Sequence, residues 1–130
     1  GRPDLASLAS GYAWLALGLL ALGLAPAGAA RAAALHLLTI GALGSLTLNV
    51  MVNTMLLKAK RPRQGQVLPL LATALIAAAA LLRGGAAFAG PHATWLLALG
   101  AACWSTAFLA AFGLIAGCSH ALAARTAPRP

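Results

Sequence analysis

The residues best suited to chemistry lie in one apolar segment, 35–57. His36 stands near its beginning, Asn49 and Asn53 follow four residues apart, and Met51 lies between them. The segment is long enough to cross a bilayer, where polar groups are costly unless they find partners inside a protein bundle. An imidazole in such a place is expected to be hydrogen-bonded or to bind a metal or cofactor. His36 is therefore the main candidate for a functional site.

Two kinds of metal chemistry fit these residue types. A neutral imidazole nitrogen is a common axial ligand of haem iron, and thioether sulfur favours copper(I). His92, near the start of the last apolar run, is a candidate second metal ligand, and Met51 is a candidate copper ligand. Structural roles are the alternatives: a hydrogen-bonded packing histidine for His36, an interfacial residue for His92, and adaptable packing for Met51.

A helical wheel at about 100° per residue predicts two special faces on this segment. Gly41 and Gly44 form a small-residue face, which suits close contact with another helix. The other face is a polar stripe that runs the length of the helix and is expected to bond to neighbouring helices; it comprises His36, Thr39, Ser45, Thr47, Asn49, Asn53 and Thr54.

Composition indicates a membrane protein. Hydrophobic residues make up 62% of the 130 positions and charged residues 8%, and the mean hydropathy is +0.90. A soluble domain of this size has about a quarter of its residues charged. This chain cannot build such a solvated surface, so we expect the lipid bilayer to surround it.

Four apolar runs predict an all-α, polytopic transmembrane bundle that forms a single domain over residues 1–130. The expected spans are about 5–25, 35–57, 67–88 and 92–117. The third run is short, and it reaches the interface if Arg83 snorkels or if the helix continues to Phe88. The connections between runs are short, so neighbouring helices should be antiparallel and in contact.

Basic residues are concentrated on one side of the predicted bundle. With four crossings, Arg31 and Arg83 fall on one side, and the positive-inside rule places both termini in the cytoplasm and His36 and His92 near the outer face. Because the basic residues lie in short breaks between apolar runs, the expected partners are lipid and other transmembrane helices or subunits, with no nucleic acid. The cytoplasmic group comprises Arg2, Lys58, Lys60, Arg61, Arg63, Arg125 and Arg129.

The residue types of common catalytic sites are scarce. Asp4 is the only acidic residue of the chain, so paired carboxylates and intramembrane proton-relay carboxylates are excluded within it. Any catalysis would therefore depend on a cofactor. Whether the protein is an enzyme stays open at this point.

The second apolar segment resembles a helix of the NnrS family. The pattern H-x-L-T-x-G-x-x-G-x-x-x-L is present from His36 to Leu48, and Trp14 and Trp104 lie in segments that are similar to the family's flanking helices. Members are bacterial polytopic membrane proteins that contain haem and copper and are linked to nitric oxide metabolism and nitrosative stress. The resemblance implies an inner-membrane, multi-pass protein in which His36 is a haem or copper ligand and Thr39 is its neighbour. The chain would correspond to the C-terminal part of a longer member.

The sequence departs from the family pattern after the methionines. Asn53 stands where members commonly have arginine, and residues 57–61 replace a turn that contains a second histidine. Three hypotheses follow: a haem- or copper-binding protein of the nitric oxide response, a cofactor-free accessory subunit or scaffold of a membrane complex, and part of a small-solute transporter or channel.

Overall fold

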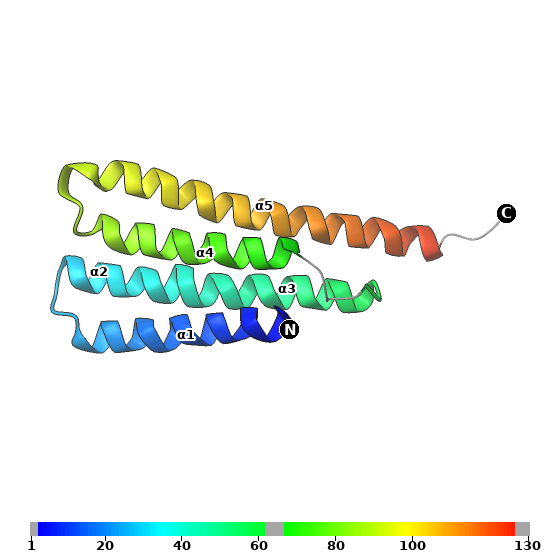
Figure 1. The fold of residues 1–130 in the computed structure, drawn as a ribbon, viewed down its shortest axis with the longest axis horizontal. Coiled ribbons are helices and arrows are strands. Elements are labelled where there is room, and N and C mark those ends of the chain that lie inside the picture. The colour runs from blue at the N-terminus through cyan, green and yellow to red at the C-terminus, as the bar shows by residue number, and fades with distance from the viewer. Residues whose placement is uncertain (1–2, 62–66, 127–130) are drawn as a thin grey trace.

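The computed structural model, which describes residues 3–61 and 67–126, is a bundle of four long antiparallel helices (Figure 1). The second span is one continuous rod with a π-helical middle. The elements in chain order are α1 (Pro3–Leu24), α2 (Ala29–His36), the π-helix η1 (Leu37–Gly44), α3 (Ser45–Lys58), α4 (Val67–Ala86), the 3₁₀ turn η2 (Gly90–His92) and α5 (Ala93–Thr126).

All four rods are long and apolar enough to cross a membrane, which confirms the predicted all-helical, four-span class. Their bounds differ from the expected ones. The second rod begins at Ala29 instead of near 35, because the intervening alanines are the strongest helix formers and Arg31 is also a good one. The last rod continues to Thr126 instead of ending near 117, since one glycine at 117 costs only about 1 kcal/mol against alanine. Helix α4 ends at Ala86, two residues early.

Residues with positive φ lie in the turns between helices: Gly28, Lys60 and Gly90. Gly28 has φ 89° directly before α2, a conformation that glycine adopts without steric cost. Lys60 has φ 52° after α3. There the Lys60 N–H donates to the Leu57 carbonyl and the Arg61 N–H donates to the Leu56 carbonyl, which is the Schellman pattern that usually has glycine at this position.

The helix ends follow the predicted alternation. The start of α1, the end of α3 and the end of α5 lie at one end of the bundle, and the α1–α2 and α4–α5 turns lie at the other (Figure 1). Which end faces the cytoplasm stays a prediction. Three residues of the predicted cytoplasmic group, Arg2, Arg63 and Arg129, lie outside the described residues.

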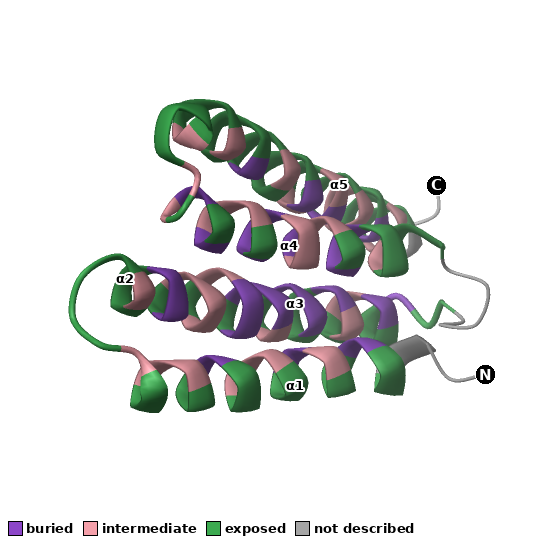
Figure 2. Cartoon of the chain, turned by 60° about the vertical axis from the view of Figure 1, so that its left-hand side comes forward, coloured by how far each residue is buried: buried purple, intermediate pink, exposed green. Residues whose placement is uncertain are grey.

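The buried core lies between the second rod, α4 and α5, and α1 packs on the outer side of the second rod. Figure 2 shows the buried residues concentrated on the second rod and on the inner face of α4. Glycines allow the close approach of α1: a Cβ added at Gly11 would lie 2.6 Å from Leu46 Cδ2, and one at Gly18 would lie 2.7 Å from Leu38 Cδ2. The core cluster comprises Leu48, Val52, Leu56, Ala59, Ala72, Ile76, Ala107, Ala111 and Cys118.

Candidate functional site

The π-helical segment η1 determines which residues of the second rod face the rest of the bundle. A π-helix closes its hydrogen bonds one residue further along than an α-helix does, so its turns are wider and residues beyond it are rotated from their ideal wheel positions. Ser45 and Asn49 lie on the buried face with the glycines, whereas Thr47 and Thr54 are exposed. The polar stripe predicted to run the whole length is therefore divided between two faces.

His36 is the last residue of α2 and directly precedes η1. It lies seven residues from the start of the rod at Ala29, or about 10 Å along the helix axis. Its side chain is half-buried and lines a pocket of about 430 Å³. The histidine therefore lies inside the bundle, more than a turn away from the end of the rod.

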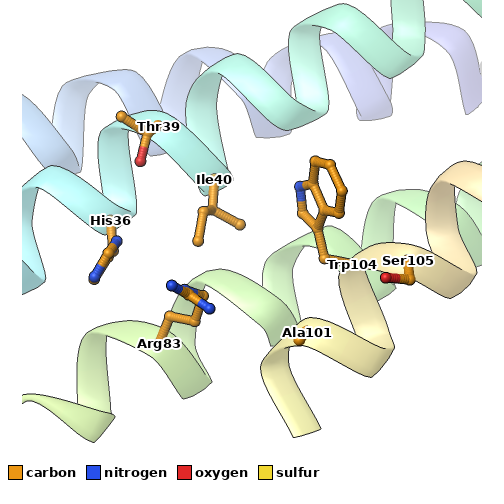
Figure 3. Close-up of a pocket in the computed structure, with 7 residues that line it drawn as sticks. All are labelled: His36, Thr39, Ile40, Arg83, Ala101, Trp104 and Ser105. Atoms are coloured by element: carbon orange, nitrogen blue, oxygen red, sulfur yellow. The ribbon is translucent and has the colours of Figure 1, made fainter. Parts of the chain in front are cut away.

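The pocket is built from three different helices (Figure 3). The second rod contributes one wall, α4 contributes a single arginine, and α5 contributes the opposite wall. The His36 ring points toward α4, the Arg83 guanidinium points toward the second rod, and the Trp104 indole points from α5 toward the second rod. The lining residues are His36, Thr39, Ile40, Arg83, Ala101, Trp104 and Ser105.

Arg83 is the charged residue of this pocket. Its side chain is half-buried, and its Nε is a buried donor without a hydrogen-bond partner. Gly100 gives its stem room to pass α5, since a Cβ at that position would lie 3.0 Å from Arg83 Cγ. Arg83 was expected to extend toward the membrane interface. In the structure, its Nε is buried inside the bundle. Sequence reasoning missed Arg83, Trp104 and Ser105 as pocket residues.

Thr39 lies beside His36 in the pocket wall, one turn along the rod. Its Oγ1 donates a hydrogen bond to the Leu35 carbonyl at 2.8 Å. Because this bond occupies the hydroxyl proton, the donor that Thr39 could offer to a ligand is already committed to the helix. The oxygen lone pairs are what Thr39 presents to the pocket.

A second, apolar compartment of about 740 Å³ continues from the first along α3 and α5. The two compartments share Trp104 and Ser105 in their walls and are therefore adjacent; we call the pair the groove. The Trp104 and Phe108 rings pack at a centroid distance of 4.6 Å within it. Met51 lies in this apolar furrow. The furrow is lined by Leu48, Met51, Trp104, Ser105, Phe108, Leu109, Ala111, Phe112 and Ile115.

The predicted metal ligand His92 does not line the pocket of His36. His92 lies in η2, is exposed, and is not among the residues that line the pocket. Within residues 3–61 and 67–126, no group of three or more His, Cys, Asp or Glu side chains could hold a metal ion. The ligand roles predicted for His36, Met51 and His92 stay predictions.

The residues predicted to form helix contacts lie on the buried side of the second rod. A Cβ added at Gly41 would lie 2.9 Å from the Trp14 ring, and one at Gly44 would lie 3.3 Å from Ile76 Cγ2. Asn49 is buried, and its Oδ1 accepts a hydrogen bond from Asn53 Nδ2 at 3.2 Å. That bond lies within α3, whereas bonds between helices were expected.

Comparison with known families decides the identity of the chain. The family model described as NnrS protein matches residues 1–118 of the 130. The chain belongs to the NnrS family. This NnrS-family chain is accordingly a membrane protein related to the nitric oxide response. The family is known for binding haem and copper in general. No curated protein and no solved structure matches the chain significantly.

Proposed function

We propose that this chain binds haem within the membrane as part of the nitric oxide response, and that His36 would hold the iron through an imidazole nitrogen. The observation that carries the proposal is the convergence of three side chains from three helices in one intramembrane pocket: His36, Arg83 and Trp104. An imidazole in the membrane is costly unless it is bonded or ligated, so ligation gives His36 a reason to be there.

The residues of the groove fit the chemistry of a tetrapyrrole. A haem needs a nitrogen ligand, flat apolar walls and cations or donors for its two carboxylates. His36 would supply the nitrogen, Trp104 and Ile40 would supply apolar wall, and the Arg83 guanidinium, which points into the pocket, would supply the cation. The apolar furrow beyond Trp104 gives further space for a flat ring. When bound, haem would supply reversible binding of diatomic gases and one-electron chemistry.

The chain's own residues would set the conditions for that chemistry. His36 would fix the position of the iron near the Arg83 end of the groove. Trp104 and Phe108, packed together on α5, would exclude water from the furrow side. Thr39 would offer only its oxygen, as a hydrogen-bond acceptor, because its hydroxyl proton is donated to the Leu35 carbonyl. The location in a bacterial inner membrane is part of the proposal, and copper binding through Met51 is its alternative.

The test is the absorption spectrum and the metal content of the purified protein. We expect a Soret band and about one iron per chain from cells supplied with a haem precursor. His36→Ala should lose the band or shift it, because the axial nitrogen is gone. His92→Ala is the matched control, since His92 is exposed and lies outside the pocket, and it should keep the spectrum of the wild type.

Three results would contradict the proposal. One is an unchanged spectrum in His36→Ala. Another is wild-type protein without a Soret band from fully supplied cells, which would favour a cofactor-free accessory subunit or a transporter portion. The third is stoichiometric copper without haem, which would transfer the metal role to copper ligands such as Met51.

A further inference from the structure

The charge of Arg83 is not neutralised by any carboxylate side chain of this sequence inside the membrane. The one acidic residue, Asp4, lies in the first turn of α1. That turn is at the end of the bundle opposite the α4–α5 turn, near which Arg83 lies (Figure 1). A charged side chain that faces the inside of a membrane bundle is costly unless it is paired. A carboxylate that pairs with Arg83 within the membrane would therefore come from outside this sequence.

The position of Arg83 suits a bound anion. Its guanidinium points into the pocket that His36 and Ser105 also line (Figure 3). A guanidinium carries five N–H donors, and a carboxylate or phosphate oxygen would pair with those that face the pocket. Guanidinium is also the side chain whose geometry best matches these two anions.

Beyond the Arg83 pocket, the groove is lined by apolar side chains. From Ala101 to Ile115 its α5 wall extends over fifteen residues, or about 21 Å along the helix. A molecule that fills it has an anionic end at the Arg83 pocket and an apolar body along Trp104, Phe108 and Ile115. Small inorganic anions would leave the furrow empty, and neutral hydrocarbons would leave Arg83 without a partner.

From this arrangement we infer that Arg83 is the receptor for the anionic group of an amphiphile whose apolar body lies in the furrow. The anion is a carboxylate or phosphate. Two sources carry this chemistry: the carboxylates of a tetrapyrrole and the headgroup of a single-chain lipid. The inference therefore goes beyond ligation by His36, because it concerns the other end of the ligand and holds for an occupant without iron.

The test compares each ligand with its uncharged ester in the intact protein, held in bilayer discs of zwitterionic lipid. One arm uses haemin and haemin dimethyl ester, and the other uses a fluorescent fatty acid and its methyl ester. A hydrogen bond to a charged group contributes enough for about tenfold in affinity or more. We expect at least one anion to bind about tenfold more tightly than its ester, and Arg83→Gln to reduce that ratio to near one.

Two control variants keep the test decisive. Arg31→Gln removes the same charge at the same end of the bundle, but Arg31 is exposed and outside the pocket, so the ratio should persist. Gly100→Ala keeps the charge and displaces the arginine stem, because the new Cβ would lie 3.0 Å from Arg83 Cγ. We expect it to lower the ratio even if Arg83→Gln fails to fold.

The outcomes distinguish a tetrapyrrole from a lipid as the source of the anion. They also distinguish the inference about Arg83 from the proposal that His36 binds haem. Dependence on Arg83 in the haemin arm identifies the tetrapyrrole as the source, and dependence only in the fatty acid arm identifies a lipid. Equal binding of acid and ester in both arms, or an equal change in Arg31→Gln, overturns the inference. Loss of haemin binding in His36→Ala with no effect of Arg83 would retain the haem proposal and reject this one.

Discussion

Replacing Gly18 by alanine tests how α1 is held against the second rod. A Cβ at this position would lie 2.7 Å from Leu38 Cγ and Cδ2, and 3.1 Å from the Leu38 backbone nitrogen. The leucine side chain can rotate away, but the backbone nitrogen cannot move without the whole rod. We therefore expect α1 to shift outward and to lose packing.

The expected magnitude combines two opposing effects. Overpacking a close contact costs typically about 1–3 kcal/mol. Alanine in place of glycine favours a helix by about 0.8–1.0 kcal/mol. Gly23 lies five residues further along α1, and a Cβ added there would meet nothing within 4 Å, so Gly23→Ala gains the propensity without the clash. The difference between the two variants isolates the clash, and we expect Gly18→Ala to be less stable than Gly23→Ala by about 1–3 kcal/mol.

The measurement is unfolding in mixed micelles by titration with a denaturing detergent, followed by circular dichroism. The midpoint should fall in Gly18→Ala and stay or rise in Gly23→Ala. Leu38→Ala removes the two closest side-chain atoms, so Gly18→Ala should cost less in that background, as a double-mutant cycle would show. Equal midpoints for Gly18→Ala and Gly23→Ala would refute the packing of α1 described above.

Three further predictions concern a buried hydroxyl, a helix end and the topology. Ser45→Ala should change stability by less than about 1 kcal/mol, because the Ser45 Oγ is buried without a partner. Thr73→Val should cost more, since it removes a 2.9 Å bond to the Pro69 carbonyl. The reverse order would contradict these hydrogen-bond assignments. Lys60→Gly should stabilise by up to about 1 kcal/mol, because φ at Lys60 is 52°; Lys58→Gly, inside α3, should destabilise, and equal losses would reject the strain. In a chain with Cys103 and Cys118 replaced by serine, a cysteine introduced at Ala27 should react with an impermeant thiol reagent in spheroplasts. A cysteine introduced at Lys60 should react only after permeabilisation. The opposite pattern would show that the predicted topology is inverted.

The four-helix architecture was predictable because bilayer thickness and hydrophobic length determine it. Apolar runs separated by basic or glycine- and proline-containing breaks leave few other arrangements. The bounds were less predictable, since alanines on both sides of Arg31 extend a helix as well as leucines do. Lys60 in a left-handed conformation carries no sequence signal, because glycine is the residue that normally marks this position.

The candidate site was only partly predictable for a different physical reason. His36 was identified because an imidazole is costly in a membrane. Its partners depend on the rotation of three helices about their axes, and the π-helical segment Leu37–Gly44 changes that rotation within the second rod. A lone arginine such as Arg83 near the end of an apolar run is usually an interfacial residue. Gly100 leaves room for the Arg83 side chain, and this role can be recognised only when α4 and α5 are seen packed together.

The central claim is that His36 supplies the iron ligand in a pocket between the second rod, α4 and α5. The most direct measurement is the absorption spectrum of haem-loaded His36→Gly before and after addition of free imidazole. Removing the side chain leaves space for imidazole at the same place in the pocket. We expect the Soret band to be shifted or lost in His36→Gly and to return to the wild-type position with imidazole. A wild-type spectrum in His36→Gly without imidazole would contradict the account.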